Sequence, residues 1–109
     1  MNKLTKLTSV LILTLGITTG AQAETRAQLI DRGANNTAFY VACNNFYKNK
    51  FPRLQKGVDF WVNKIIYSGN FYRSEINAYK QLANTYGYIY GLTGVSFKVC
   101  SNKNKTITF

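Results

Sequence analysis

Few side chains in this sequence could carry acid–base, metal or nucleophilic chemistry. The chain has no histidine and only four carboxylates, which are spread along it at Glu24, Asp31, Asp59 and Glu75. No D-x-D or E-x-x-E spacing places two of them together for a cation or for a general acid–base pair. No S-x-x-K motif activates a serine, and no glycine-rich loop precedes a helix. The sequence therefore predicts a protein that is not an enzyme and that holds neither a metal nor a cofactor.

The two cysteines, Cys43 and Cys100, are the remaining reactive pair. Their separation is far from the C-x-x-C spacing of redox and metal sites, and no histidine could complete a set of metal ligands. In an oxidising compartment such a pair forms a structural disulfide. Closing a loop of this length would destabilise the unfolded state by about 4 kcal/mol in the chain-entropy model. We therefore expect a single disulfide between them.

The first 23 residues have the pattern of an export signal. Lys3 and Lys6 give a cationic start, residues 10–17 form an apolar run too short to span a bilayer, and residues 21–23 (Ala-Gln-Ala) form a small-x-small cleavage site. Cleavage after Ala23 would leave residues 24–109 as one small domain, without a transmembrane segment. The expected location is the periplasm or the medium, which is where a disulfide persists.

Three segments with helical apolar periodicity predict an all-α fold. The first covers residues 25–48, with Gly33 as a point where it could divide into two shorter helices. The second begins at Pro52 and runs to the turn at residues 68–70. The third begins with Ser74 as its N-cap and runs to about Tyr90. The expected architecture is a small helical bundle of three to four helices held by one disulfide.

The chain after Tyr90 has a weaker pattern. Its aromatic and β-branched residues could form a strand within residues 86–99, but its glycines favour irregular chain as far as Cys100. The polar tail after Cys100 could fray, or its residues 106–109 could pack or pair locally. Among the many aromatic residues, we expect Trp61 in the core. The tyrosines in excess of what a small core needs are candidates for a binding face, and they are Tyr47, Tyr67, Tyr72 and Tyr88.

The chain is strongly basic, with a formal charge of +10 from 14 Lys and Arg against four Asp and Glu. Loss of Lys3 and Lys6 with the signal would leave +8. Such a field attracts acidic proteins and anionic envelope surfaces, while export disfavours nucleic acid as the partner. We expect Arg53, Lys56 and Lys64 to form a basic contact surface. The alternative is that they are an ordinary solvated face. Lysines near the end of the chain could join them if the disulfide forms, and these are Lys98, Lys103 and Lys105.

Three short segments resemble the periplasmic acid-stress chaperone family HdeA/HdeB. They are residues 43–46 (Cys-Asn-Asn-Phe), 57–61 (Gly-Val-Asp-Phe-Trp) and 100–106 (Cys-Ser-Asn-Lys-Asn-Lys-Thr). The resemblance implies a helical fold, a disulfide between the two equivalent cysteines, and a holdase whose apolar surface is exposed to clients when acid loosens the fold. An acid switch needs groups that gain protons as the pH falls, and only four carboxylates are present here. The fold could therefore carry over without the acid-triggered function.

The sequence leaves three functions open. The first is a non-enzymatic exported protein-binding module that acts as an HdeA-like chaperone or another stress-related periplasmic protein. The second is an immunity or inhibitor protein that neutralises a secreted toxin or cell-wall amidase, because small helical proteins of that kind have a similar outline. The third is a cationic protein that binds the envelope or a membrane surface, which the charge beside amphipathic helices suggests. The expected partner is another protein in the first two cases and an anionic surface in the third.

Overall fold

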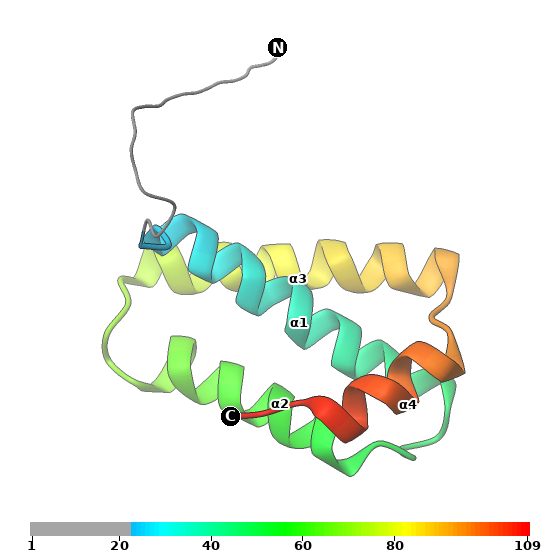
Figure 1. Ribbon diagram of the computed structural model, residues 1–109. Helices are drawn as coiled ribbons and strands as arrows, with labels where there is room; N and C mark the ends of the chain where they lie inside the picture. Colours follow the sequence, from blue (N-terminus) through cyan, green and yellow to red (C-terminus); the bar gives the residue numbers. More distant parts are fainter. Residues whose placement is uncertain (1–22) are drawn as a thin grey trace, which may run out of the picture.

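The computed structural model describes residues 23–109, so the expected export signal lies outside the described residues except for Ala23. This part of the chain contains four α-helices and a π-helical turn, and no strand. They are α1 (Arg26–Phe46), α2 (Pro52–Val62), η1 (Asn63–Tyr67), α3 (Arg73–Thr93) and α4 (Phe97–Thr106) (Figure 1). The predicted all-α bundle of three to four helices is confirmed. No helix within residues 23–109 is long and apolar enough to cross a membrane.

Helix α1 is the centre of the bundle. It packs against α2, α3 and α4, whereas α3 packs mainly on α1. Figure 1 shows α1 and α3 running side by side in the same direction, with α2 and α4 returning below them. The chain thus alternates in direction from one helix to the next, and the short connections place every helix against α1 or its neighbour.

Helix α1 is continuous over Arg26–Phe46 and does not divide at Gly33. The helix begins at a capping box, in which the Thr25 hydroxyl accepts from the Gln28 backbone N–H and the Gln28 side chain accepts from the Thr25 N–H. Gly33 is buried inside the helix, where a Cβ atom would lie 2.6 Å from Cε3 of Trp61. The glycine therefore allows α2 to approach closely and does not break the helix.

The turn after α1 is closed by a side chain. Lys48 and Asn49 have φ values of 57° and 60°, in the left-handed region that cannot continue a helix. The buried Asn44 side chain accepts from the Phe51 N–H at 2.9 Å and donates to the Phe51 carbonyl at 3.2 Å. Pro52 then starts α2 at a position where its missing N–H is not needed. The predicted boundary between the first two helices is thus confirmed.

Helix α2 and η1 together form the predicted second segment. Their buried face carries Leu54, Gly57, Trp61 and Ile65, which pack on α1. The last turn widens from α-helical to π-helical over residues 63–67. Trp61 is in the core, as the sequence predicts.

The N-cap of helix α3 lies two residues before the predicted one, and the helix ends later than predicted. Its N-cap is Tyr72, because the Glu75 carboxylate accepts from the Tyr72 N–H at 2.9 Å and so fixes the first turn there. The helix continues past Tyr90 to Thr93. Gly94, with a φ of 77°, ends it.

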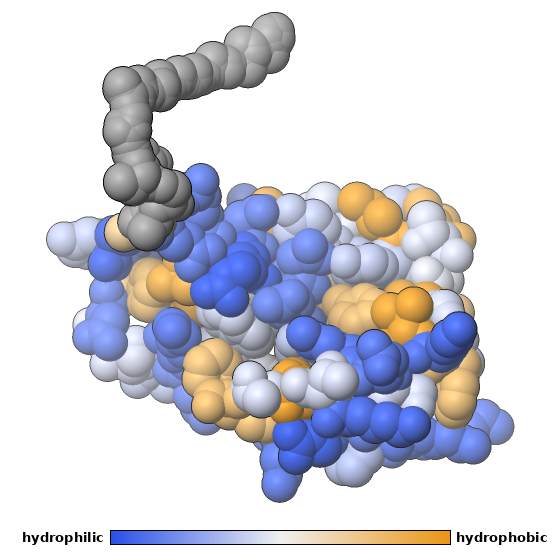
Figure 2. Space-filling model, in the orientation of Figure 1, coloured by the Kyte–Doolittle hydropathy of each residue, from blue (hydrophilic) through white to orange (hydrophobic). Residues whose placement is uncertain are grey.

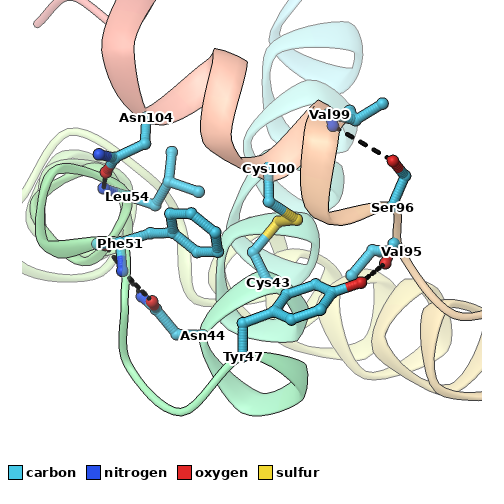
Figure 3. The surroundings of a disulfide bond; sticks show 10 residues. All are labelled: Cys43, Asn44, Tyr47, Phe51, Leu54, Val95, Ser96, Val99, Cys100 and Asn104. Atoms are coloured by element: carbon cyan, nitrogen blue, oxygen red, sulfur yellow. Dashed lines mark hydrogen bonds between the residues drawn. A yellow bond between two sulfur atoms is a disulfide. The ribbon is translucent and has the colours of Figure 1, made fainter.

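The segment predicted to be irregular from Tyr90 to Cys100 is largely helical, so that prediction is wrong. The Ser96 hydroxyl caps α4 by accepting from the Val99 N–H at 3.3 Å. At the other end, the Asn104 side chain accepts from the N–H groups of Arg53 and Leu54, and so caps the start of α2 (Figure 3). The two bonds from Asn104 join residues about fifty positions apart in the sequence. A local sequence pattern near α4 therefore cannot predict them.

The Arg53 guanidinium completes this junction between α2 and α4. It donates to the carbonyls of Asn104 at 3.0 Å and Ile107 at 2.6 Å. Ile107 is buried against the core, where its Cδ1 lies beside Gly57. The chain after α4 is therefore packed at Ile107 and does not fray there.

The predicted disulfide is present and joins α1 to α4. The two sulfurs belong to Cys43 and Cys100, which are 57 residues apart in the sequence and are both fully buried (Figure 3). Phe51 and Leu54 lie beside them in the core. The bond holds the start of α4 against the C-terminal part of α1.

Candidate functional site

The four carboxylates of the described residues are engaged separately. Each one is bound by a different neighbouring side chain, so no two share a ligand. The four pairs are Glu24 with Arg32, Asp31 with Tyr86, Asp59 with Gln55, and Glu75 with Arg26. No group of three metal-ligating side chains occurs between residues 23 and 109. Within this part of the chain, two carboxylates pair with arginines and two accept hydrogen bonds from uncharged side chains.

The two arginine pairs also keep their carboxylates ionised. The Arg26 guanidinium and the Tyr72 N–H lower the pKa of Glu75 to about 2. The Arg32 guanidinium lowers the pKa of Glu24. A carboxyl group with a lowered pKa does not hold a proton near neutral pH, so neither of these could act there as a general acid.

The three predicted basic residues lie on α2 and η1 but do not form one cluster. Arg53 is held by the carbonyls at the end of α4, and Lys56 is exposed on the same helix. Lys64 lies on η1 with its Nζ 5.5 Å from the Phe60 ring centroid. It lines a hollow with Arg32 and with Lys103. Of the three C-terminal lysines, Lys103 thus lines the same hollow as Lys64. The contact role of Arg53, Lys56 and Lys64 stays a prediction.

The four candidate tyrosines differ in their surroundings. Tyr67, Tyr72 and Tyr88 are exposed and lie on separate elements or at opposite parts of α3. Tyr47 is half-buried, because its hydroxyl donates to the Val95 carbonyl at 2.6 Å and its ring packs edge-on against Phe97 (Figure 3). The tyrosines do not make one shared face, and Tyr47 connects α1 to the start of α4.

A shallow groove runs between α1 and α3. It has a volume of about 450 Å³, and small side chains form most of its lining. We call it the α1–α3 groove, lined by Ala38, Val41, Ala42, Ala83, Asn84 and Gly87. Because small residues leave the backbones of both helices accessible, a helix or an extended segment of another chain could approach closely here.

Exposed apolar side chains also occur at the ends of α1 and α3 and at the start of α4. We call them the apolar end, which consists of Phe46, Ile89, Leu92, Phe97 and Val99. Figure 2 shows apolar surface over the last part of α3 and over the start of α4, with hydrophilic surface around it. Leu92 is 70% exposed, which is unusual for a side chain that would gain free energy from burial. An apolar area rimmed by polar residues marks an interaction surface in many soluble proteins.

The groove was not predicted from the sequence, although the sequence contains a weak signal for it. Ala34, Ala38 and Ala42 repeat every four residues, and Gly87 and Gly91 have the same spacing. This spacing places small residues on one side of a helix. It does not reveal which other helix lies beside that side, so only the packing of α3 on α1 turns two small-residue rows into a groove.

Comparisons with protein-family models, with curated proteins and with solved structures give no match for this chain. Function is therefore inferred from the surfaces of the protein. Between residues 23 and 109 these surfaces include the α1–α3 groove, the apolar end, and the hollow lined by Arg32, Lys64 and Lys103.

Proposed function

We propose that this protein binds a segment of another exported protein in the α1–α3 groove and on the apolar end, without catalysing a reaction. The single observation that carries the proposal is the apolar end, whose large side chains stay exposed in a folded, disulfide-linked domain that also has an open groove between α1 and α3. An amphipathic helix or an extended segment with apolar anchors matches such a surface. Large apolar anchors supply most of the affinity in interfaces of this kind.

The glycines of the bundle support the same surface. A glycine inside a helix costs about 1 kcal/mol relative to alanine, so it is retained where packing demands it. Gly33 and Gly57 meet this condition, because a Cβ atom on either would lie within 3 Å of a side chain of a neighbouring element. Gly87 and Gly91 do not, because a Cβ atom there would have no neighbour within 4 Å. A bound partner that approaches α3 closely would account for both.

The identity of the partner separates two forms of this proposal. The resemblance to HdeA/HdeB favours a chaperone that holds many unfolded clients in the periplasm. The immunity form instead binds one secreted toxin or cell-wall amidase. In both forms the apolar end is already exposed in the folded protein, so binding does not need acid to unfold the bundle. This is the main physical difference from an acid-activated holdase.

The proposal is tested with two variants of the binding surface and one matched control. Leu92→Ser removes an anchor of the apolar end, and Gly87→Leu adds a large side chain to the groove at a position where a Cβ atom meets no neighbour within 4 Å. Tyr72→Ser is the control, because Tyr72 is 73% exposed at the opposite end of the same helix, away from the apolar end. We expect both surface variants to weaken binding by about tenfold or more, while the control binds normally.

Two measurements use these variants. Suppression of aggregation of a reduced, denatured model protein reports the holdase form. Isolation of one partner at a fixed stoichiometry from envelope extract, under non-reducing conditions, reports the immunity form. If Leu92→Ser and Gly87→Leu behave like the control in both measurements, the protein does not bind other proteins through this surface.

A second candidate function is favoured by the charge beside the apolar end. Lys98 and Lys105 line a shallow surface on α4 together with Phe97 and Val99. Cationic side chains next to exposed apolar ones are typical of helices that lie on anionic membrane surfaces. Binding to anionic vesicles that persists in high salt, and that is lost in Phe97→Ser, would support this function. Complete release by salt would reduce it to nonspecific charge attraction.

A further inference from the structure

A second concave site lies away from the groove, on the other side of α1. It is a hollow of about 280 Å³ between α1, the end of α2 with η1, and the chain at and after the end of α4. Figure 1 shows the C-terminal segment in front of α2, and the Phe109 ring lies 6.1 Å from the Phe60 ring. We call this site the basic hollow, defined by Arg32, Tyr40, Trp61, Lys64, Lys103 and Phe109.

The basic hollow has an excess of positive charge. Three cationic side chains line it, from α1, η1 and α4. Arg32 is neutralised, because its Nε and one terminal nitrogen bind the two carboxylate oxygens of Glu24 at 2.8 and 2.9 Å. Lys64 and Lys103 form no ion pair with any carboxylate of the described residues. The Glu24 carboxylate interacts with Lys64 at longer range, but neither lysine has a carboxylate in contact, so the hollow keeps an excess of positive charge that favours an anion there.

The hollow also contains a buried hydroxyl group that no neighbour uses. Tyr40 is only 3% exposed, its ring packs against Gly57, and its hydroxyl has no hydrogen-bond partner within residues 23–109. The other deeply buried tyrosine, Tyr79, does have one, because its hydroxyl pairs with Thr37 at 2.6 Å. Burial raises the pKa of Tyr40, so the phenol keeps its proton and can donate it in a hydrogen bond. Buried polar groups without partners are rare, and a ligand is one explanation for them.

Aromatic rings make up much of the remaining wall. Trp61 lies under both cations, with the Arg32 guanidinium carbon 5.0 Å and the Lys64 nitrogen 5.7 Å from its ring centroid. Phe60 and Phe109 stand beside it at the opening. Such a wall suits a flat apolar group, while the lysines suit its charged end.

We propose that the basic hollow binds a small organic anion, in which a carboxylate or phosphate group is attached to an aromatic ring. The anionic group lies between Lys64 and Lys103 and accepts a hydrogen bond from the Tyr40 hydroxyl. The ring packs against Phe60, Trp61 and Phe109. The site is independent of the α1–α3 groove, because none of these residues lines that groove.

The chain contains a single tryptophan, so the fluorescence of Trp61 reports directly on this hollow. The probes are phenyl phosphate and benzoate, with inorganic phosphate and benzylamine as controls that lack the ring or reverse the charge. We expect a saturable fluorescence change with phenyl phosphate or benzoate, about tenfold weaker binding of inorganic phosphate, and no saturable change with benzylamine. The stronger of the two organic probes identifies the preferred anionic group.

Variants of the hollow test the geometry. Lys64→Gln and Lys103→Gln should each weaken binding of the better probe by about fivefold, and Tyr40→Phe by a similar factor. Lys80→Gln is the matched control, because Lys80 is an exposed lysine on α3 outside the hollow and should leave binding unchanged. The proposal is overturned if benzylamine binds as well as phenyl phosphate, if neither organic anion binds, or if the three variants bind like the control.

Discussion

Helices α1 and α3 are equally long, with 21 residues each, yet they differ sharply in burial. Nine residues of α1 are buried, including the polar Thr37 and Asn44, whereas Tyr79 is the only fully buried residue of α3. The reason is position, because α1 has neighbours on several sides and α3 has one main neighbour. A helix at the centre must satisfy its polar groups inside the protein, while a helix at the edge can present side chains to a partner.

The small residues of the two helices show the same contrast. In α1, Gly33 and Ala34 are buried where α2 and α3 pack closely, so their size stabilises the fold. In α3, Gly87 and Gly91 face open space. Glycine thus allows close packing in α1, whereas in α3 it leaves part of the helix surface accessible. The proposed binding surface lies on the second.

Removing the disulfide is expected to have the largest effect on this comparison. The bond ties α1 to α4 across 57 residues, and its loss should lower the free energy of unfolding by about 4 kcal/mol. Urea unfolding with and without dithiothreitol measures the change. The double variant Cys43→Ala/Cys100→Ala is the control, because reductant should not shift its midpoint. An unchanged midpoint of the natural protein after complete reduction would contradict the central role of this bond.

Alanine substitutions at glycines should give opposite signs in the two helices. Gly33→Ala places a Cβ atom 2.6 Å from Trp61, so we expect it to lower the free energy of unfolding by about 1–3 kcal/mol. Gly91→Ala meets no neighbour and should raise the free energy of unfolding by up to about 1 kcal/mol through helix propensity. Thermal unfolding followed by circular dichroism measures both. Destabilisation by Gly91→Ala would show that α3 is more constrained than its packing indicates.

The pair that joins the starts of the two helices should give the smallest effect. Because the folded pKa of Glu75 is about 2 and its usual value is 4.5, its stabilising contribution is complete above pH 4.5 and is lost as the pH falls towards 2. The Arg26 side chain is 53% exposed, so water screens the pair and the contribution is small. Glu75→Gln should therefore melt below the natural protein at pH 6, and the difference should shrink towards pH 2. Asp59→Asn controls for the change in net charge, and a difference that does not depend on pH would refute this assignment.

Part of the fold could be predicted from local pattern and covalent chemistry. Apolar periodicity predicted the first three helices, Pro52 marked the start of α2, and two cysteines in an expected export context predicted their bond. The helices depend on residues that are neighbours in the chain, and two cysteines allow only one intramolecular disulfide. The burial of Trp61 could be predicted because Trp61 lies on the apolar face of α2.

The errors arose where distant residues decide local structure. Helix α4 is capped by Ser96 at its start and joined at its end to Arg53, so bonds from α2 order a segment whose own pattern is weak. The N-cap of α3 is Tyr72 and not the predicted Ser74, because the Glu75 carboxylate accepts from the Tyr72 N–H and also binds Arg26 of α1. Propensity alone does not contain these contacts, since tertiary partners can override it.

The amino-acid sequence by itself determined that the chain is helical, basic and cross-linked once, because periodicity, charge and cysteine number are properties of the chain alone. The tertiary structure decided which surfaces exist. It placed the small residues of α3 beside those of α1 to form a groove, and it brought Tyr40, Lys64 and Lys103 from three separate elements to one hollow. These arrangements depend on how separate helices pack, which is a matter of shape and of partners far away in the sequence.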